Sequence, residues 1–153
     1  MKKHTYFTYI LVIPIFAISL AGFAQKSPND LVKKFFKEYE NDGPSMAIDN
    51  LYKTNKWMSR STDAIAKLKS SMEGLNEDFV GKFYGYELIV EKKLTDSFLL
   101  QSYLVKFDRQ PIRYTFQFYK PNDEWMIFGL KYDGNLDDEI EESAKLFYLE
   151  LNN

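Results

Sequence analysis

The sequence predicts an α+β fold, with three N-terminal helices, a four-stranded antiparallel sheet in meander order and a C-terminal helix. Three observations support this prediction. Apolar residues recur at helical spacing between residues 28 and 75, and they alternate along four stretches between residues 83 and 133. Helical spacing returns over residues 136–151. We therefore expect one sheet whose core face is covered by helices.

The first helix is predicted to begin after Ser27, a favourable capping residue that precedes Pro28. Asp30 lies in the first turn, where a negative charge stabilises the helix. Gly43 and Pro44 are expected to end it. The residues of its apolar stripe are Leu31, Val32, Phe35, Phe36 and Tyr39.

A second helix is expected over residues 44–53, and a third begins near residues 61–63. The connector between them contains Trp57. Two interpretations of Trp57 remain open: it lines a pocket, or it packs under the helices as a hydrophobic plug.

The second and third strands are predicted to form a hairpin across residues 108–111. We expect Phe107 to pair with Ile112. Alternation then places six large side chains on one face, which is the expected core face. They are Tyr103, Val105, Phe107, Ile112, Tyr114 and Phe116.

The fourth strand is expected to contribute Met126, Phe128, Leu130 and Tyr132 to the core. The opposite sheet face then carries more large apolar side chains than a solvated surface usually shows. This predicts a face that binds a partner, either a second copy of the chain or an envelope protein. Its expected residues are Ile89, Arg113, Tyr119, Trp125 and Ile127.

The last helix, residues 136–151, has an apolar stripe and begins with the acidic run 137–139. Acidic residues stabilise a helix N-terminus, so the run is interpreted as charge complementation and not as a metal site. Two arrangements remain open. The helix folds back over the outer sheet face and leaves a monomer, or it packs at the sheet edge and leaves that face open for a second copy.

The N-terminus is typical of a secretory signal peptide. Lys2 and Lys3 precede an apolar run over residues 10–20, and residues 22–24 (Gly-Phe-Ala) suit cleavage before Gln25. The run is short for a membrane span, which makes an uncleaved anchor the less favoured alternative. We expect residues 1–24 to be a signal peptide and residues 25–153 to be a single exported domain, periplasmic or secreted, with no membrane anchor after cleavage.

Composition excludes several classes of site. The only histidine is His4, within the predicted signal peptide, and the chain has no cysteine. Histidine-dependent triads, cysteine nucleophiles and ordinary zinc sites are therefore excluded from the mature chain. We expect no metal and no cofactor. The net charge of −2 becomes more negative without Lys2 and Lys3, which argues against a nucleic-acid partner.

The order of elements over residues 28–133 resembles the cystatin-like α+β cone of the nuclear transport factor 2 (NTF2-like) superfamily. The stretches 81–87 and 109–121, with Trp125, also resemble small exported bacterial proteins of unknown function. The resemblance implies a curved sheet, a pocket between helices and sheet, and frequent dimerisation through the sheet. The superfamily includes both enzymes and non-enzymatic binders.

Four aromatic residues are candidates to line such a pocket: Trp57, Tyr86, Tyr103 and Tyr114. The alternative is a packed aromatic core whose hydroxyls reach backbone or water. The leading hypothesis is an exported binding domain that acts through the sheet face or an aromatic pocket, where the ligand is small and apolar. The alternative is an NTF2-like isomerase, dehydratase or hydrolase that uses tyrosine and a carboxylate. The absence of a catalytic motif favours binding over catalysis.

Overall fold

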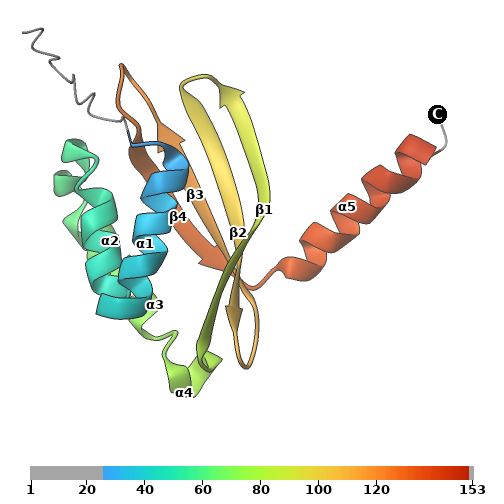
Figure 1. The fold of residues 1–153 in the computed structure, drawn as a ribbon, viewed down its shortest axis with the longest axis horizontal. Helices are drawn as coiled ribbons and strands as arrows, with labels where there is room; N and C mark the ends of the chain where they lie inside the picture. Colours follow the sequence, from blue (N-terminus) through green and yellow to red (C-terminus); the bar gives the residue numbers. More distant parts are fainter. Residues whose placement is uncertain (1–25, 152–153) are drawn as a thin grey trace, which may run out of the picture.

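A computed structural model describes residues 26–151, which form a four-stranded antiparallel sheet with helices on one of its faces (Figure 1). The predicted signal peptide lies outside the described residues. Along the described part of the chain, no helix has both the length and the apolar character needed to cross a membrane. The elements are α1 (Pro28–Asp42), α2 (Pro44–Tyr52), η1 (Lys56–Arg60), α3 (Thr62–Glu73), α4 (Glu77–Val80), β1 (Phe83–Thr95), β2 (Phe98–Phe107), β3 (Ile112–Tyr119), β4 (Met126–Asp133) and α5 (Leu136–Leu151).

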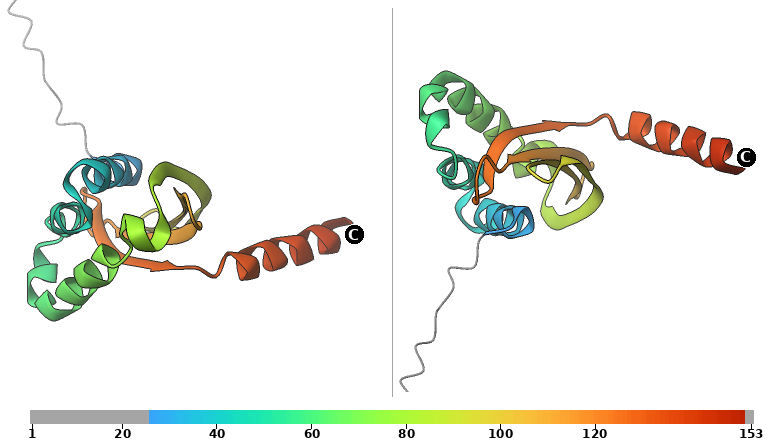
Figure 2. Two further views of the ribbon diagram at one scale, coloured as in Figure 1. Left: turned by 90° about the horizontal axis from the view of Figure 1, so that it is seen from below. Right: turned by 90° about the horizontal axis from the view of Figure 1, so that it is seen from above.

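The strands pair in chain order, β1-β2-β3-β4, as the meander prediction requires. The sheet is strongly curved, and α1 and α2 lie against one of its faces (Figures 1 and 2). In all three views α5 points away from the sheet and from the other helices. The α+β class with a four-stranded antiparallel sheet is therefore confirmed. Neither of the two arrangements considered for the last helix, across the outer sheet face or at the sheet edge, is observed.

Local sequence explains the start of α1 and its junction with α2. The Asp30 amide donates to Ser27 Oγ at 3.2 Å, and the Ser27 amide donates to Asp30 Oδ2 at 3.1 Å, which completes a capping box. Gly43 ends α1 with φ of 86°, a conformation that favours glycine. Pro44 then begins α2 directly. The sharp junction brings the two helices together over the sheet.

The core is formed by rings from α1 packed against rings from the sheet. Phe36 stacks on Tyr86 with ring centroids 3.8 Å apart, and it also contacts Tyr103 of β2. Phe35 meets Phe116 edge-to-face at 5.2 Å. Such pairs contribute about 0.5–1.5 kcal/mol each beyond their buried area. The aromatic stripe of α1 thus joins the first three strands.

The predicted hairpin register is wrong by two residues. Val105, and not Phe107, pairs with Ile112, and Tyr103 pairs with Tyr114. The loop between β2 and β3 is longer than predicted because it forms hydrogen bonds with residues distant in the sequence. The Asp108 amide donates to the Lys82 carbonyl at 2.9 Å, and the Arg109 amide donates to the Val80 carbonyl at 3.0 Å. A shift of two preserves the side-chain faces, so the six predicted core residues are all buried.

The predicted phase of β4 is also wrong at its start. The pairing of β3 with β4 shifts between Gln117 and Phe118, so Phe118 pairs with Ile127. This bulge reverses the faces that simple alternation assigns. Ile127 is 0% exposed in the core, whereas Phe128 is 53% exposed on the other face. Trp125 likewise packs against the core, so neither it nor Ile127 lies on the predicted partner face.

Two short helical segments were not predicted, η1 and α4. Gly81 follows α4 with φ of 83°, and a Cβ there would lie 2.6 Å from Asp108 Cβ and 2.8 Å from the Arg109 amide nitrogen. Glycine therefore permits the close approach of the β2–β3 loop. That approach leads to the two loop hydrogen bonds that set the hairpin register.

The bulge predicts opposite effects for two adjacent residues. Ile127→Ala should lower the free energy of unfolding by about 2–5 kcal/mol, because it leaves a cavity in a closed core. Phe128→Ala should cost no more than about 1.5 kcal/mol, because it removes chiefly an edge-to-face contact with Phe98. Urea unfolding of the two variants measures the difference. Equal losses, or a larger loss for Phe128→Ala, would contradict the bulge and would indicate that Phe128 lies in the core.

Candidate functional site

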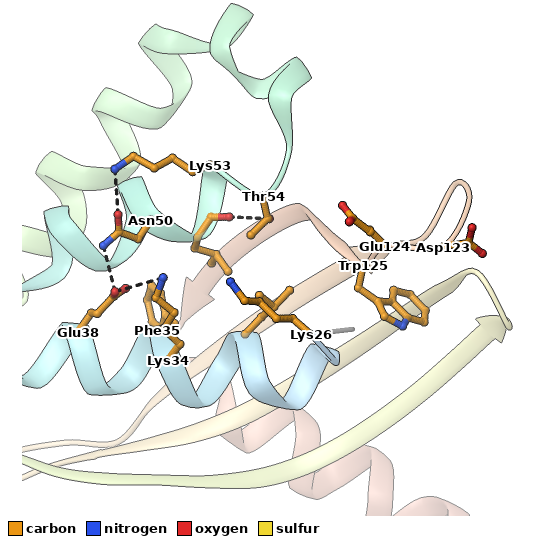
Figure 3. Close-up of a pocket in the computed structure, with 12 residues that line it drawn as sticks. Lys26, Lys34, Phe35, Glu38, Asn50, Lys53, Thr54, Asp123, Glu124 and Trp125 are labelled. Carbon is orange, nitrogen blue, oxygen red and sulfur yellow. Dashed lines mark hydrogen bonds and ion pairs between the residues drawn. The ribbon is translucent and has the colours of Figure 1, made fainter. Parts of the chain in front are cut away.

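A cleft of about 680 Å³ is bounded by α1, by the end of α2 and by the turn between β3 and β4 (Figure 3). It lies beside the aromatic core and opens to solvent. Its size is within the range of small-molecule sites. The lining residues are Lys26, Leu31, Lys34, Phe35, Glu38, Asn50, Leu51, Lys53, Thr54, Asp123, Glu124 and Trp125.

One side of the cleft carries a row of polar side chains that bond to one another. Lys53 Nζ donates to Asn50 Oδ1 at 3.0 Å, and Asn50 Nδ2 donates to Glu38 Oε1 at 3.0 Å. Lys34 Nζ lies 3.6 Å from the same Glu38 oxygen. Figure 3 shows this row connecting α1 to α2. The row presents oriented donors and acceptors at the edge of an apolar space.

The apolar part of the cleft comes from three elements. Leu31 and Phe35 belong to the α1 stripe, Leu51 lies at the end of α2, and Trp125 precedes β4. The ammonium group of Lys120 lies 5.2 Å from the centroid of the Trp125 ring, a favourable cation–π arrangement. Trp125 is therefore placed where it can form one wall of the cleft.

The segment that ends α2 holds β4 in position. The Ile127 amide donates to Thr54 Oγ1 at 3.1 Å, and Asn55 Nδ2 donates to the Ile127 carbonyl at 2.8 Å. The Leu130 amide donates to the Tyr52 hydroxyl at 3.2 Å. These bonds satisfy backbone groups of an edge strand that would otherwise face water. They also fix the distance between α2 and Trp125.

The predicted aromatic pocket is filled. Tyr86, Tyr103 and Tyr114 all lie against α1, as the prediction requires, but they pack together with Phe36. The Tyr103 hydroxyl donates to Gln101 Oε1 at 3.2 Å, and the Tyr114 hydroxyl donates to the Tyr39 hydroxyl at 3.2 Å. Trp57 is elsewhere, 57% exposed on η1. The packed-core interpretation describes the three tyrosines, and neither interpretation describes Trp57.

The tyrosine hydroxyls are neutral groups in this core. Burial raises the pKa of Tyr103 to about 12, with smaller contributions from Tyr86 and Glu91. Burial also raises the pKa of Tyr114, to which its neighbour Tyr39 adds. Both groups therefore stay protonated over the physiological range.

The structure places some residues of the predicted partner face on the sheet surface and others against the core. Tyr119, Ile89 and Arg113 stay on the sheet surface, and Tyr119 contacts the ring of Phe98. Phe98 and Phe128 take the places expected for Trp125 and Ile127. Alternation along β4 misplaced Phe128 because it does not register the bulge. The polar row of the cleft was missed because Glu38 and Asn50 meet only when α1 and α2 pack.

Comparison of the chain with protein-family models, with curated proteins and with solved structures gives no match.

The raised tyrosine pKa predicts a loss of stability at alkaline pH. Below about pH 10 the phenol is neutral in both states, so its contribution to stability is fully present. Above pH 10 the unfolded chain ionises first, and stability falls until the folded pKa of about 12 is reached. In the Tyr103→Phe variant, the unfolding midpoint should therefore decrease less between pH 10 and 12 than it does in the unsubstituted protein. Exposed Tyr119→Phe should leave it unchanged, and equal slopes in both variants would contradict the assignment.

Proposed function

We propose that the mature domain is an exported binding module that takes a small amphipathic ligand in the cleft between α1, α2 and Trp125. The observation that supports this is the juxtaposition of an apolar floor with an ordered polar row in one open cleft. Apolar walls with a few oriented polar groups are the usual composition of ligand sites. The ligand's apolar part would lie along Leu31 and Trp125.

The charges in the cleft define the polar end of the ligand. Three lysines and three carboxylates line it, so its formal charge is balanced: Lys26, Lys34, Lys53, Glu38, Asp123 and Glu124. A balanced site does not select strongly for a net charge, and it suits a neutral or zwitterionic polar group. We therefore propose a zwitterionic or uncharged amphiphile as the ligand class.

A relationship to the NTF2-like cone is part of this proposal. The curved meander and the helix that lies in its concave face support it (Figure 2). The superfamily resemblance implies a pocket between helices and sheet. In this chain that volume holds the rings of Phe35 and Phe36, and the open cleft lies beside them.

The enzymatic alternative is an isomerase, dehydratase or hydrolase. Such chemistry requires a tyrosine and a carboxylate facing one open cavity. The cleft contains carboxylates, but Tyr103 and Tyr114 bond to Gln101 and Tyr39 inside the core, and Tyr86 stacks on Phe36. Binding is the function that the cleft supports better.

The two tryptophans of the chain permit a direct test of ligand binding. Trp57→Phe leaves Trp125 as the only tryptophan, and Trp125→Phe leaves Trp57, which is outside the cleft. The probe is dodecylphosphocholine, a zwitterionic amphiphile, below its micelle concentration. We expect a saturable blue shift of emission in the Trp125 reporter and no saturable change in the Trp57 reporter.

Matched lysine variants locate the polar end of the probe. Lys53→Ala in the Trp125 reporter should weaken binding about threefold to tenfold, because it removes a charged donor from the row. Lys67→Ala, an exposed lysine of α3 outside the cleft, should leave affinity unchanged. The proposal fails if neither reporter shows a saturable shift, or if both lysine variants weaken binding equally.

Export is the second part of the proposal, supported by the N-terminal pattern of charge, apolar run and small residues. Intact-mass measurement of the protein purified from its natural cells should show the loss of residues 1–24. Retention of Met1 in a membrane fraction would instead indicate an uncleaved anchor.

A further inference from the structure

The helix α5 leaves its own domain with an apolar stripe in solvent. Ile140 is 67% exposed, Phe147 is 59% exposed and Tyr148 is 66% exposed. Ile140, Ala144 and Phe147 repeat at spacings of four and three, which places them on one side of the helix. In proteins most of the stability of a helix comes from the packing of such a stripe. The stripe therefore needs a covering surface.

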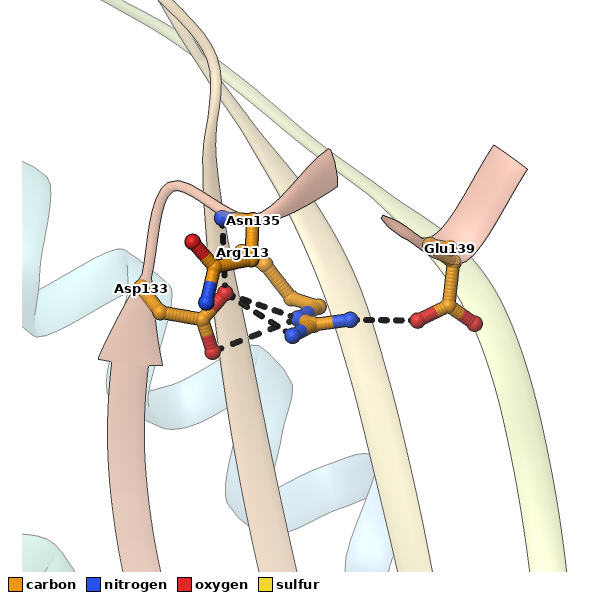
Figure 4. A network of polar contacts seen from close by, with 4 residues as sticks. All are labelled: Arg113, Asp133, Asn135 and Glu139. Carbon is orange, nitrogen blue, oxygen red and sulfur yellow. Dashed lines mark hydrogen bonds and ion pairs between the residues drawn. The ribbon is translucent and has the colours of Figure 1, made fainter. Parts of the chain in front are cut away.

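An ion-pair network fixes the direction in which α5 leaves the sheet. Arg113 Nη2 on β3 lies 2.8 Å from Asp133 Oδ1, and Arg113 Nη1 pairs with Glu139 in the first turn of α5 (Figure 4). The Asn135 amide donates to Asp133 Oδ1 at 3.0 Å, which orders the short link before the helix. Because these contacts hold both ends of the link, they direct α5 away from its own sheet.

The sheet of the same chain offers a second apolar surface. It is exposed at Tyr119 and Phe128, and it is half-buried at Phe98, Leu100 and Leu104. The outer face of the sheet, turned away from α1 and α2, combines large apolar side chains with basic ones. The residues of the outer face are Phe98, Leu100, Leu104, Lys106, Arg113, Gln117, Tyr119, Phe128 and Lys131. Phe98 contacts both Tyr119 and Phe128, with ring centroids 6.4 Å and 5.4 Å away. This aromatic group is left open to solvent at one end of the face.

Charge distinguishes between the surfaces that could cover α5. The α5 sequence contains six acidic residues and one lysine. The outer face carries three basic residues. Lys106 pairs with Glu87, Arg113 pairs with Asp133 and Glu139 of its own chain, and Lys131 has no ion pair among the described residues. Two α5 helices laid against each other would bring like charges together instead. Charge therefore favours helix against sheet over helix against helix.

The two surfaces are similar in length. At 1.5 Å per residue the 16 residues of α5 extend about 24 Å. At about 3.3 Å per residue the eight residues of β3 extend about 26 Å. One α5 is thus long enough to cover one outer face.

We propose that two copies of the chain exchange their α5 helices, so that the Ile140–Phe147 stripe of each copy packs on the outer face of the other. Exchange of an element between identical chains forms a two-fold symmetric dimer, and in this dimer both exposed surfaces would be covered. The proposal is independent of ligand binding in the cleft, which lies on the other side of the sheet. The cleft experiment and the test below can therefore fail separately.

The absence of cysteine from the chain allows a specific cross-linking test. Residues 25–153, which include every described element, are prepared with Ala144→Cys on α5 or with Gln117→Cys on the outer face. The two proteins are mixed and treated with a short bis-maleimide. We expect a covalent heterodimer, together with a dimer mass in sedimentation of the unmodified protein at about 100 μM. Phe147→Asp should weaken association about tenfold or more.

Controls separate the exchanged dimer from its alternatives. Met46→Cys on α2, exposed but on the covered side of the sheet, should give no adduct with Ala144→Cys. Adducts of Ala144→Cys with itself alone would show helix-to-helix pairing. A cross-linked monomer of the doubly substituted chain would show that α5 folds back on its own sheet. Either of these results, or a monomer at 100 μM with no adduct, would overturn the proposal.

Discussion

The packing of the α1 aromatic stripe against the concave face of the sheet is the interaction on which the rest of the structure depends. Phe35 and Phe36 together contact rings from β1, β2 and β3. Their burial fills the volume in which the sequence analysis expected a pocket. The open space is consequently displaced to the side of α1, where α2 and Trp125 complete the cleft. The site is thus a consequence of how the core is filled.

The two edge strands of the sheet, β4 and β1, are protected from pairing with another chain in different ways. Thr54, Asn55 and Tyr52 bond to the backbone of β4, so that edge is covered by the α2 segment. The β1 edge carries bulges and the charged pair Lys92 and Lys93, features that oppose edge-to-edge association. Association through the strand edges is therefore disfavoured. The proposed exchange instead uses the outer face and α5.

Much of the fold was predictable because it is encoded locally. Ser27, Pro28 and Asp30 specify the start of α1 within four residues, and alternation along β2 and β3 identified the core face. The errors have non-local causes. The hairpin register depends on contacts of the Asp108 loop with Val80 and Lys82. The phase of β4 depends on a bulge that alternation does not reveal.

The candidate site was less predictable than the fold. The sequence pointed to tyrosines, and three of them do lie together under α1, but as packed and hydrogen-bonded core residues. The polar residues of the cleft have no distinctive spacing in the sequence. Glu38 and Asn50 are brought together only by the angle between α1 and α2, which follows from the Gly43–Pro44 junction.

The most direct test of this account is a nuclear Overhauser measurement on the mature domain with selectively labelled phenylalanine and tyrosine. If the α1 stripe fills the concave face, the ring protons of Phe36 should show strong contacts to Tyr86, whose ring centroid is 3.8 Å away, and Phe35 should show contacts to Phe116. An interior that remains open would give no contact between Phe36 and Tyr86, and water would contact both rings. That result would return the ligand site to the space between α1 and the sheet and would contradict the assignment of the cleft.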